Sequence, residues 1–262
     1  MRKPTFALLF ALVGSLFLGG TAQAAPAAYP VENATVLTHN ALYASGRLAG
    51  TNCPEPAVRA GDVASVRNYL TPLLKCLDTA WSAQFAKAGI GFVKPRVKFI
   101  TTPQRVCGEK WGKDVQALYC DETRQITVML DKSVVDHPED LFLMDVIAHE
   151  YGHHVQNMAG MSHALDRLPN RGKAEYLEQT RRHELQAECL AGVFIGSIWT
   201  SLDRTGQDWK TLLRDDLESG DETTDVRDHG KGRNIAEWLD RGFKAVSPSG
   251  CNTWSAGSAT VA

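Results

Sequence analysis

What this 262-residue sequence has little of excludes several classes of protein. Apart from one apolar stretch near the N-terminus, no segment approaches the roughly 18 continuous apolar residues that a membrane-spanning helix needs. Basic residues are not in excess, because 28 Lys and Arg stand against 30 Asp and Glu, for a formal charge of −2. A chain without a basic run has no electrostatic footprint for nucleic acid, so we expect none as a partner. The six cysteines form no CxxC pair, which argues against a cysteine-based zinc knuckle.

The first 24 residues have the pattern of a secretory signal peptide. Arg2 and Lys3 give a positive start, residues 6–18 are almost entirely apolar, and residues 22–24 (AQA) form a small-x-small cleavage site. We therefore expect a secreted protein with no stable membrane insertion once the signal is removed. The alternative is an uncleaved anchor.

The mature chain, residues 25–262, is expected to form a single domain that mixes helices with a small sheet. Apolar periodicity and turn residues predict an irregular N-terminal wrap followed by helices and two strands. The predicted elements are the wrap at residues 25–60, helices at 63–88, 136–158, 173–200 and 234–246, strands at 95–100 and 124–131, a linker at 161–172 and an acidic loop at 215–232.

The helix expected from Asp136 has both start and stop signals. Asp136, Pro138 and Glu139 together make the pattern of a capping box with an early proline, and Gly160 supplies the stop after Met158.

Within that helix lies the segment VIAHEYGHHVQNMAG, at residues 146–160. His149 and His153 are four residues apart, so they project from one face and can both reach a metal about 2.0 to 2.1 Å away. Glu150 lies about 100° around the helix, from where its carboxylate can reach a metal-bound water without binding the metal. This is the chemistry of H-E-x-x-H, two ligands and a general base. His154 points elsewhere, and we expect it to pack.

A third protein ligand is needed, and the following helix offers candidates in RRHELQAEC: His183, Glu184 and Glu188. Glu184 and Glu188 are again four apart and share one face. One can bind the metal while the other hydrogen-bonds the far nitrogen of a ligating histidine. Apolar neighbours of the pair indicate a largely buried helix, in which carboxylates need partners.

These segments closely resemble the bacterial neutral zinc metallopeptidases, whose pattern is HExGHHVQ followed by ELQADCxAG. The matching stretches here are AHEYGHHVQ, HELQAECLAGVF, NALYASGRL and HGKGRNIAEWLDRGFKAVSPSGCNTW, and the resemblance covers about residues 38–254. It implies a zincin-like α+β fold, in which a small sheet packs on the HExxH helix and the remainder is mostly helical.

The resemblance also implies roles for individual residues. His149, His153 and Glu184 would bind one Zn²⁺ per chain, and Glu150 would be the general base. Glu188 stands where the family usually has aspartate, so Glu188 as third ligand stays open as an alternative. His229 matches the family's His-Gly position and could donate a hydrogen bond to the oxyanion. A solvated loop histidine is equally compatible with the sequence.

An even number of cysteines in an exported protein favours disulfides, with fifteen possible pairings. We expect Cys107–Cys120, because two strands would bring the ends of that segment together. Cys53–Cys76 and Cys189–Cys251 are the hypothesis for the remainder; the second would tie the tail to the metal-binding helix.

The sequence thus predicts a secreted zinc metallopeptidase that hydrolyses peptide bonds, with the strand at residues 124–131 as the edge that pairs with an extended peptide. One alternative is an exported zinc-binding scaffold or binding protein without peptidase activity. Another is a zinc amidase acting on cell-wall peptides, which would use the same helix.

Overall fold

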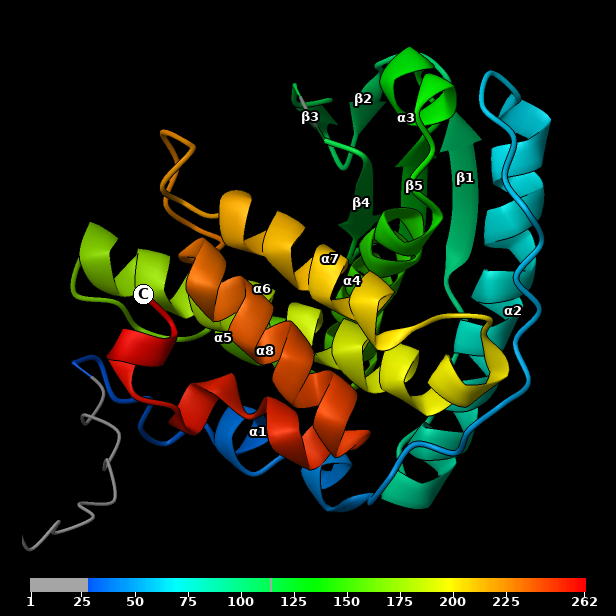
Figure 1. Ribbon diagram of the computed structural model, residues 1–262. Coiled ribbons are helices and arrows are strands. Elements are labelled where there is room, and N and C mark those ends of the chain that lie inside the picture. Colours follow the sequence, from blue (N-terminus) through cyan, green and yellow to red (C-terminus); the bar gives the residue numbers. More distant parts are fainter. Residues whose placement is uncertain (1–27, 114) are drawn as a thin grey trace, which may run out of the picture.

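Residues 28–113 and 115–262 are described by a computed structural model, shown in Figure 1. The expected signal peptide, residues 1–24, lies outside the described residues. None of the helices in the described part is long and apolar enough to cross a membrane.

Within the described residues, three strands form the main sheet, in the order β1-β5-β4. β1 (Arg96–Ile100) runs parallel to β5 (Gln125–Met129), while β4 (Ala117–Cys120) pairs antiparallel with β5. A small separate hairpin joins β2 (Arg105–Val106) to β3 (Glu109–Lys110).

The sheet corrects one expectation, because β5 is its central strand and the strand predicted at residues 124–131 cannot be the edge. The edge beside it is β4, for which the sequence predicted no strand. Four residues are too few to display a clear alternation, and β4 is a strand because it pairs with β5, with Ala117 opposite Val128.

Helices make up most of the remaining chain, with short 3₁₀ turns between them. The α-helices are α1 (Thr35–Thr38), α2 (Val63–Ala88), α3 (Lys132–Asp136), α4 (Asp140–Met158), α5 (Met161–Leu165), α6 (Lys173–Ile198), α7 (Gly206–Glu218) and α8 (Gly232–Ala245). The 3₁₀ turns are η1 (Ala41–Ala44), η2 (Trp199–Ser201), η3 (Pro248–Cys251), η4 (Thr253–Ser255) and η5 (Ser258–Thr260). The α+β class is therefore confirmed.

The helix expected to begin at Asp136 is two helices. Asp131 caps the short α3 by accepting from the backbone N–H of Val134, and Asp136 ends that helix instead of capping the next. Pro138 restrains the residue before it to a non-helical conformation, and His137 accordingly sits at φ −132°, ψ 63°. α4 starts after Glu139, whose side chain makes no cap hydrogen bond. The predicted capping box is wrong, but the end of α4 at Met158 is as expected.

Two further helices were missed. α5 occupies part of the expected linker at residues 161–172, and α7 reaches into the segment expected to be an acidic loop. α7 begins with a capping box in which Thr205 and Asp208 each bond the other's backbone N–H. The loop between α7 and α8 therefore spans only residues 219–231.

α4 lies at the centre of the molecule, between the sheet and the α6–α8 layer, with α2 along β1 (Figure 1). It contacts α2, α6, α7, β4 and β5. Gly152 permits the close crossing with α6, because a Cβ there would lie 2.6 Å from the carbonyl oxygen of Ala187. The expected packing of a small sheet on this helix is observed.

Three disulfides fasten the periphery to this core. They join Cys53 to Cys76, Cys107 to Cys120, and Cys189 to Cys251, which are the pairs expected from the sequence. The third ties η3 to α6, one residue after Glu188.

Candidate metal centre

The helix α4 presents His149, Glu150 and His153 to one side of the molecule. Its apolar residues Ile147, Ala148, Tyr151 and Val155 are almost fully buried, and this fixes the rotation of the helix. The side chains of His149 and His153 remain 19% and 14% exposed.

Glu184 of α6 meets both histidines from across the helix crossing. Its Oε2 lies 3.5 Å from His149 Nε2 and 3.2 Å from His153 Nε2. Donor atoms of a tetrahedral zinc site with bonds of 2.0 to 2.1 Å are about 3.3 Å apart, so these separations suit one zinc ion. His149, His153 and Glu184 also form a group whose potential ligand atoms lie within 4.8 Å of one another. The donor set, two imidazoles and one carboxylate, is one that zinc uses.

The far nitrogen of each histidine is held by its own acceptor. His149 Nδ1 lies 2.8 Å from Glu188 Oε2, and His153 Nδ1 lies 2.9 Å from Gln156 Oε1. Since the Gln156 amide nitrogen donates to the carbonyl oxygen of His183 at 2.7 Å, its Oε1 is left to accept. A histidine that donates from Nδ1 has its Nε2 lone pair free for a metal.

Glu188 and Glu184 therefore occupy different places. Glu188 contacts the Nδ1 side of His149, whereas Glu184 faces the Nε2 atoms of both histidines. Gln156 was missed by the sequence analysis. Its position three residues after His153, on the same helical face, is the signal that could have found it.

Electrostatics of the metal-free site reflect this clustering. Burial lowers the pKa of His149, but its hydrogen bonds to Glu184 and Glu188 outweigh that effect and raise the pKa well above its ordinary value. Burial acts to raise the pKa of Glu184, yet the charge of His153 and the histidine hydrogen bonds hold it well below its usual range. Burial raises the pKa of Glu150. Glu184 is thus an anion poised between two groups that attract it, which suits a metal ligand.

Two other histidines nearby have different partners. His154 Nδ1 bonds the Tyr119 hydroxyl at 2.9 Å and its Nε2 bonds the carbonyl oxygen of Val93 at 2.8 Å. Burial lowers the pKa of His154 to about 4. His183 stacks on the ring of His153 and places its Nε2 3.3 Å from the hydroxyl of Ser162. Neither belongs to the donor group.

His229 reaches the same site from the loop between α7 and α8. Its Nε2 lies 3.8 Å from Glu184 Oε2, and its Nδ1 lies 2.7 Å from a carboxylate oxygen of Asp228, which raises the pKa of His229. Buried Asp221 anchors this loop by accepting from the backbone N–H groups of His229 and Gly230. Nothing in the sequence distinguished Asp221 from the other acids of the loop.

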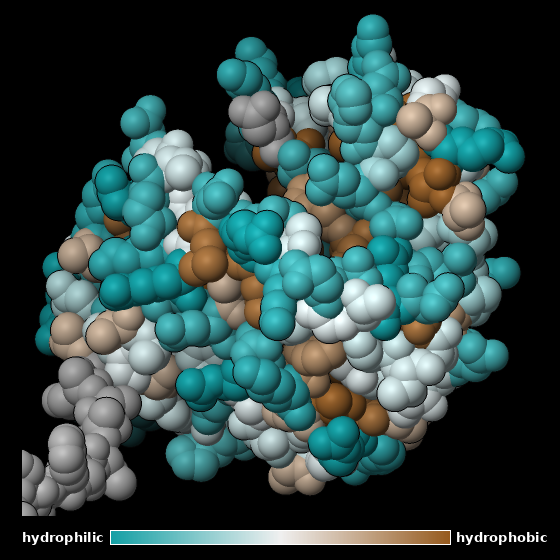
Figure 2. All heavy atoms as spheres, in the orientation of Figure 1, coloured by the Kyte–Doolittle hydropathy of each residue, from teal (hydrophilic) through white to brown (hydrophobic). Residues whose placement is uncertain are grey.

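A cleft of about 670 Å³ opens over these residues. In Figure 2 the surface is hollowed between the segment that precedes β4 and the loop that follows α7. Its lining comprises Lys113, Val115, Gln116, Ala117, Phe142, Asp145, Val146, His149, Glu150, Glu184, Leu185, Glu188, Asp216, Ser219, Thr223, Thr224, His229 and Ile235.

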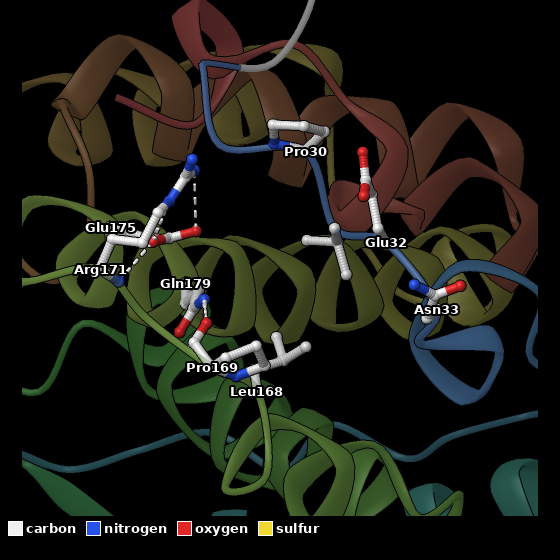
Figure 3. A pocket seen from close by; sticks show the side chains of 9 residues that line it. Pro30, Glu32, Asn33, Leu168, Pro169, Arg171, Glu175 and Gln179 are labelled. Atoms are coloured by element: carbon white, nitrogen blue, oxygen red, sulfur yellow. Dashed lines mark hydrogen bonds and ion pairs between the residues drawn. The ribbon is translucent and has the colours of Figure 1, made fainter.

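A second, smaller pocket of about 280 Å³ lies away from the metal centre, between the N-terminal segment and the start of α6 (Figure 3). Arg171 and Glu175 are bonded to each other at its edge, opposite Glu32 and Asn33. None of the histidines or acids of the metal centre lines it.

Beside His149, three carboxylates from three helices come together: Asp145, Glu188 and Asp216. Burial raises the pKa of Asp145 well above its ordinary value and that of Asp216 to about 8. Nothing in the sequence pattern indicated a role for Asp145 or Asp216.

The chain is similar in sequence to a protein family and to several individual proteins. The sequence profile of the family described as "Putative neutral zinc metallopeptidase" matches residues 54–254. The uncharacterized protein YpfJ of Escherichia coli is 29% identical over 206 residues, covering 71% of this chain and 70% of its own length. The uncharacterized protein Rv2575 of Mycobacterium tuberculosis is 30% identical over 131 residues, covering 42% of this chain and 43% of its own. No solved structure matches the chain.

Proposed function

The chain belongs to the neutral zinc metallopeptidase family, and from that premise we propose that it is a secreted peptidase that cuts peptide bonds with Glu150 as general base. The zinc would be held by His149, His153 and Glu184, one ion per chain. One observation carries the proposal: Glu150 lines the same cleft as His149 and Glu184 without belonging to the donor group.

Zinc in such a site supplies Lewis acidity, which makes water acidic near neutral pH and polarises a carbonyl group. Glu150 accepts the proton of the attacking water and passes it to the leaving amine. Glu188 and Gln156 keep His149 and His153 oriented by accepting from their Nδ1 atoms. The family's aspartate is thus replaced here by a glutamate whose longer side chain still reaches His149.

His229 is proposed to stabilise the oxyanion that forms when water attacks the carbonyl. Its Nε2 faces Glu184, and Asp228 at Nδ1 favours the protonated ring that can donate. The His229→Ala variant is expected to have a kcat about 100-fold or more below that of the parent, with unchanged zinc content. A normal kcat in that variant would remove His229 from the mechanism.

The peptide is proposed to lie along the free edge of β4 and the residues before it. Gln116 and Ala117 line the cleft, and β4 is paired on one side only among the described strands. An extended peptide that pairs with this edge would have its backbone bound independently of sequence, while the side chains around the cleft select among residues.

Secretion stays part of the proposal, supported by three disulfides, which are typical of oxidising compartments. Two alternatives have distinct signatures. A zinc-binding scaffold would have no use for Glu150 in the cleft. A zinc amidase would share the whole centre and differ only in substrate.

The test is cleavage of a diverse peptide library by the mature chain, residues 25–262, beside its Glu150→Gln variant, with zinc quantified in both. We expect both proteins to hold about one zinc and only the parent to cut, with at least a 100-fold loss in the variant. Glu139→Gln, at the exposed start of the same helix, is the matched control and should cut normally.

Equal cleavage by the parent and the Glu150→Gln variant would refute the role of Glu150. Zinc in both proteins with cleavage in neither would favour the scaffold. Cleavage confined to cell-wall peptides would favour the amidase.

A further inference from the structure

A triad of buried acids adjoins the metal centre, where Glu188 contacts His149. Asp145 comes from α4, Glu188 from α6 and Asp216 from α7, and one carboxylate oxygen of each lies within 4.8 Å of the others. These residues are only 6%, 6% and 7% exposed. Because they come from three different helices, it is the tertiary fold that brings them together.

Each acid of this triad has a buried oxygen without a partner. Five buried side-chain atoms among the described residues lack a hydrogen-bond partner, and three of the five are Asp145 Oδ1, Glu188 Oε1 and Asp216 Oδ2. Within the described part of the chain, no ion pair involves Asp145 or Asp216. The other oxygen of Glu188, Oε2, contacts His149 Nδ1. Buried polar groups in proteins almost always have partners, so unpartnered oxygens on three carboxylates that lie this close together point to a positively charged ligand.

We propose that this acidic triad binds a calcium ion, separate from the zinc of the proposed function. Three carboxylates with no imidazole or thiolate make a hard, all-oxygen donor set, which suits Ca²⁺ rather than zinc. Two oxygens that share one calcium at 2.3 to 2.6 Å can be up to about 5 Å apart, so the spacing of the triad fits.

Calcium takes six to eight ligands, and the triad supplies at most five oxygens besides Glu188 Oε2, which is bonded to His149. The remaining places can be filled by water, because all three acids also line the cleft over the metal centre. That cleft gives the ion a route of entry. Magnesium is less suited, since it demands near-ideal octahedral geometry and gives up its waters reluctantly.

Glu188 would link the two ions. Its Oε2 lies 2.8 Å from Nδ1 of His149, while its Oε1 is buried and has no hydrogen-bond partner among the described residues. An ion bound there fixes the Glu188 carboxylate and, through it, the ring of His149. The same ion ties α7, and hence the start of the loop that carries His229, to α4 and α6.

Calorimetric titration of calcium into the mature, calcium-depleted chain, with zinc content checked beforehand by mass spectrometry, tests the proposal. We expect one calcium per chain, and a rise in Tm of about 5–10 °C when free calcium is 100-fold above Kd. Asp216→Asn should abolish both effects, and Asp145→Asn, on a different helix, should do the same. Asp215→Asn is the matched control, because Asp215 is the exposed neighbour on α7.

Calcium uptake that is equal in the parent and both triad variants would overturn the proposal. So would the absence of uptake by the parent at calcium up to about 10 mM, above the range of weak extracellular sites, which would mean that the acids share protons instead. The parent measurement stands even if a variant fails to fold. Neither readout uses activity, so the result holds whether or not the chain cuts peptides.

Discussion

At the scale of single residues, the chemistry of the metal centre depends on the contacts of individual side-chain nitrogen and oxygen atoms. His149 and His153 each turn Nε2 toward Glu184 and Nδ1 toward a separate acceptor. Glu184 and Glu188 are the same residue type on the same helix, four positions apart, yet they contact opposite nitrogens of His149. Their substitutions should therefore have different consequences.

Glu184→Gln is expected to remove zinc binding, because a neutral amide replaces the carboxylate of the donor set. Glu188→Gln should keep the zinc but weaken its affinity about 10- to 100-fold, as is usual when a residue that orients a ligand is changed. Competition with a zinc-binding dye in calcium-free buffer measures both. The reverse order of severity would identify Glu188 as the third ligand.

At the scale of elements, the site depends on how closely α4 and α6 cross. The two histidines and Glu184 meet because Gly152 lets the backbone of Ala187 approach. α6 is in turn fixed from its other side by α8, where Gly192 and Gly242 permit similarly close contact with backbone atoms. These three glycines thus permit the close spacing of the helices that carry or support the proposed ligands.

Gly152→Ala is expected to push α4 and α6 apart, since its Cβ would lie 2.6 Å from the carbonyl oxygen of Ala187. Overpacking of this kind costs about 1–3 kcal/mol, and the separated ligands should also bind zinc more weakly. Thermal unfolding and zinc affinity measure the two effects. Gly91→Ala, which has no heavy atom within 4 Å of its Cβ, should change neither. Unchanged values for Gly152→Ala would mean that the crossing is not what positions the ligands.

The sequence pattern was sufficient to predict the part of α4 that carries His149, Glu150 and His153, because the 3.6-residue helical period alone determines which of these side chains share a face. The sequence pattern failed to predict structure that depends on contacts between residues distant in sequence. β4 is a strand because β5 pairs with it, and the break before α4 follows from Pro138. The orientation of Glu188 depends on a histidine 39 residues away. Asp221 and Asp216 look like solvated acids in the sequence and are buried by the fold.

At the scale of the whole molecule, one disulfide connects the C-terminal part of the chain to α6, the helix that carries Glu184 and Glu188. Cys189–Cys251 joins η3 to α6 across 62 residues, and both half-cystines are fully buried. Cys107–Cys120 spans only 13 residues, near the edge strand. Chain-entropy estimates give about 4 kcal/mol for the longer loop and about 3 kcal/mol for the shorter one.

The double variant Cys189→Ala/Cys251→Ala should therefore lose more stability than Cys107→Ala/Cys120→Ala, and it should also bind zinc more weakly, because Cys189 adjoins Glu188. Denaturant unfolding and zinc affinity of the two variants provide the comparison. If long incubation with a thiol reductant leaves both Tm and zinc affinity of the parent untouched, while the disulfide is shown to be reduced, its bracing role is refuted.

Zinc titration into the metal-free mature chain, followed by cleavage of a peptide taken from the library, tests most directly whether this centre is a peptidase. Activity is expected to rise in proportion to zinc and to level off at about one equivalent per chain, with Glu150→Gln inactive throughout. Cleavage that persists without zinc, or a chain that takes up one zinc at His149 and His153 and still cuts no peptide, would contradict it.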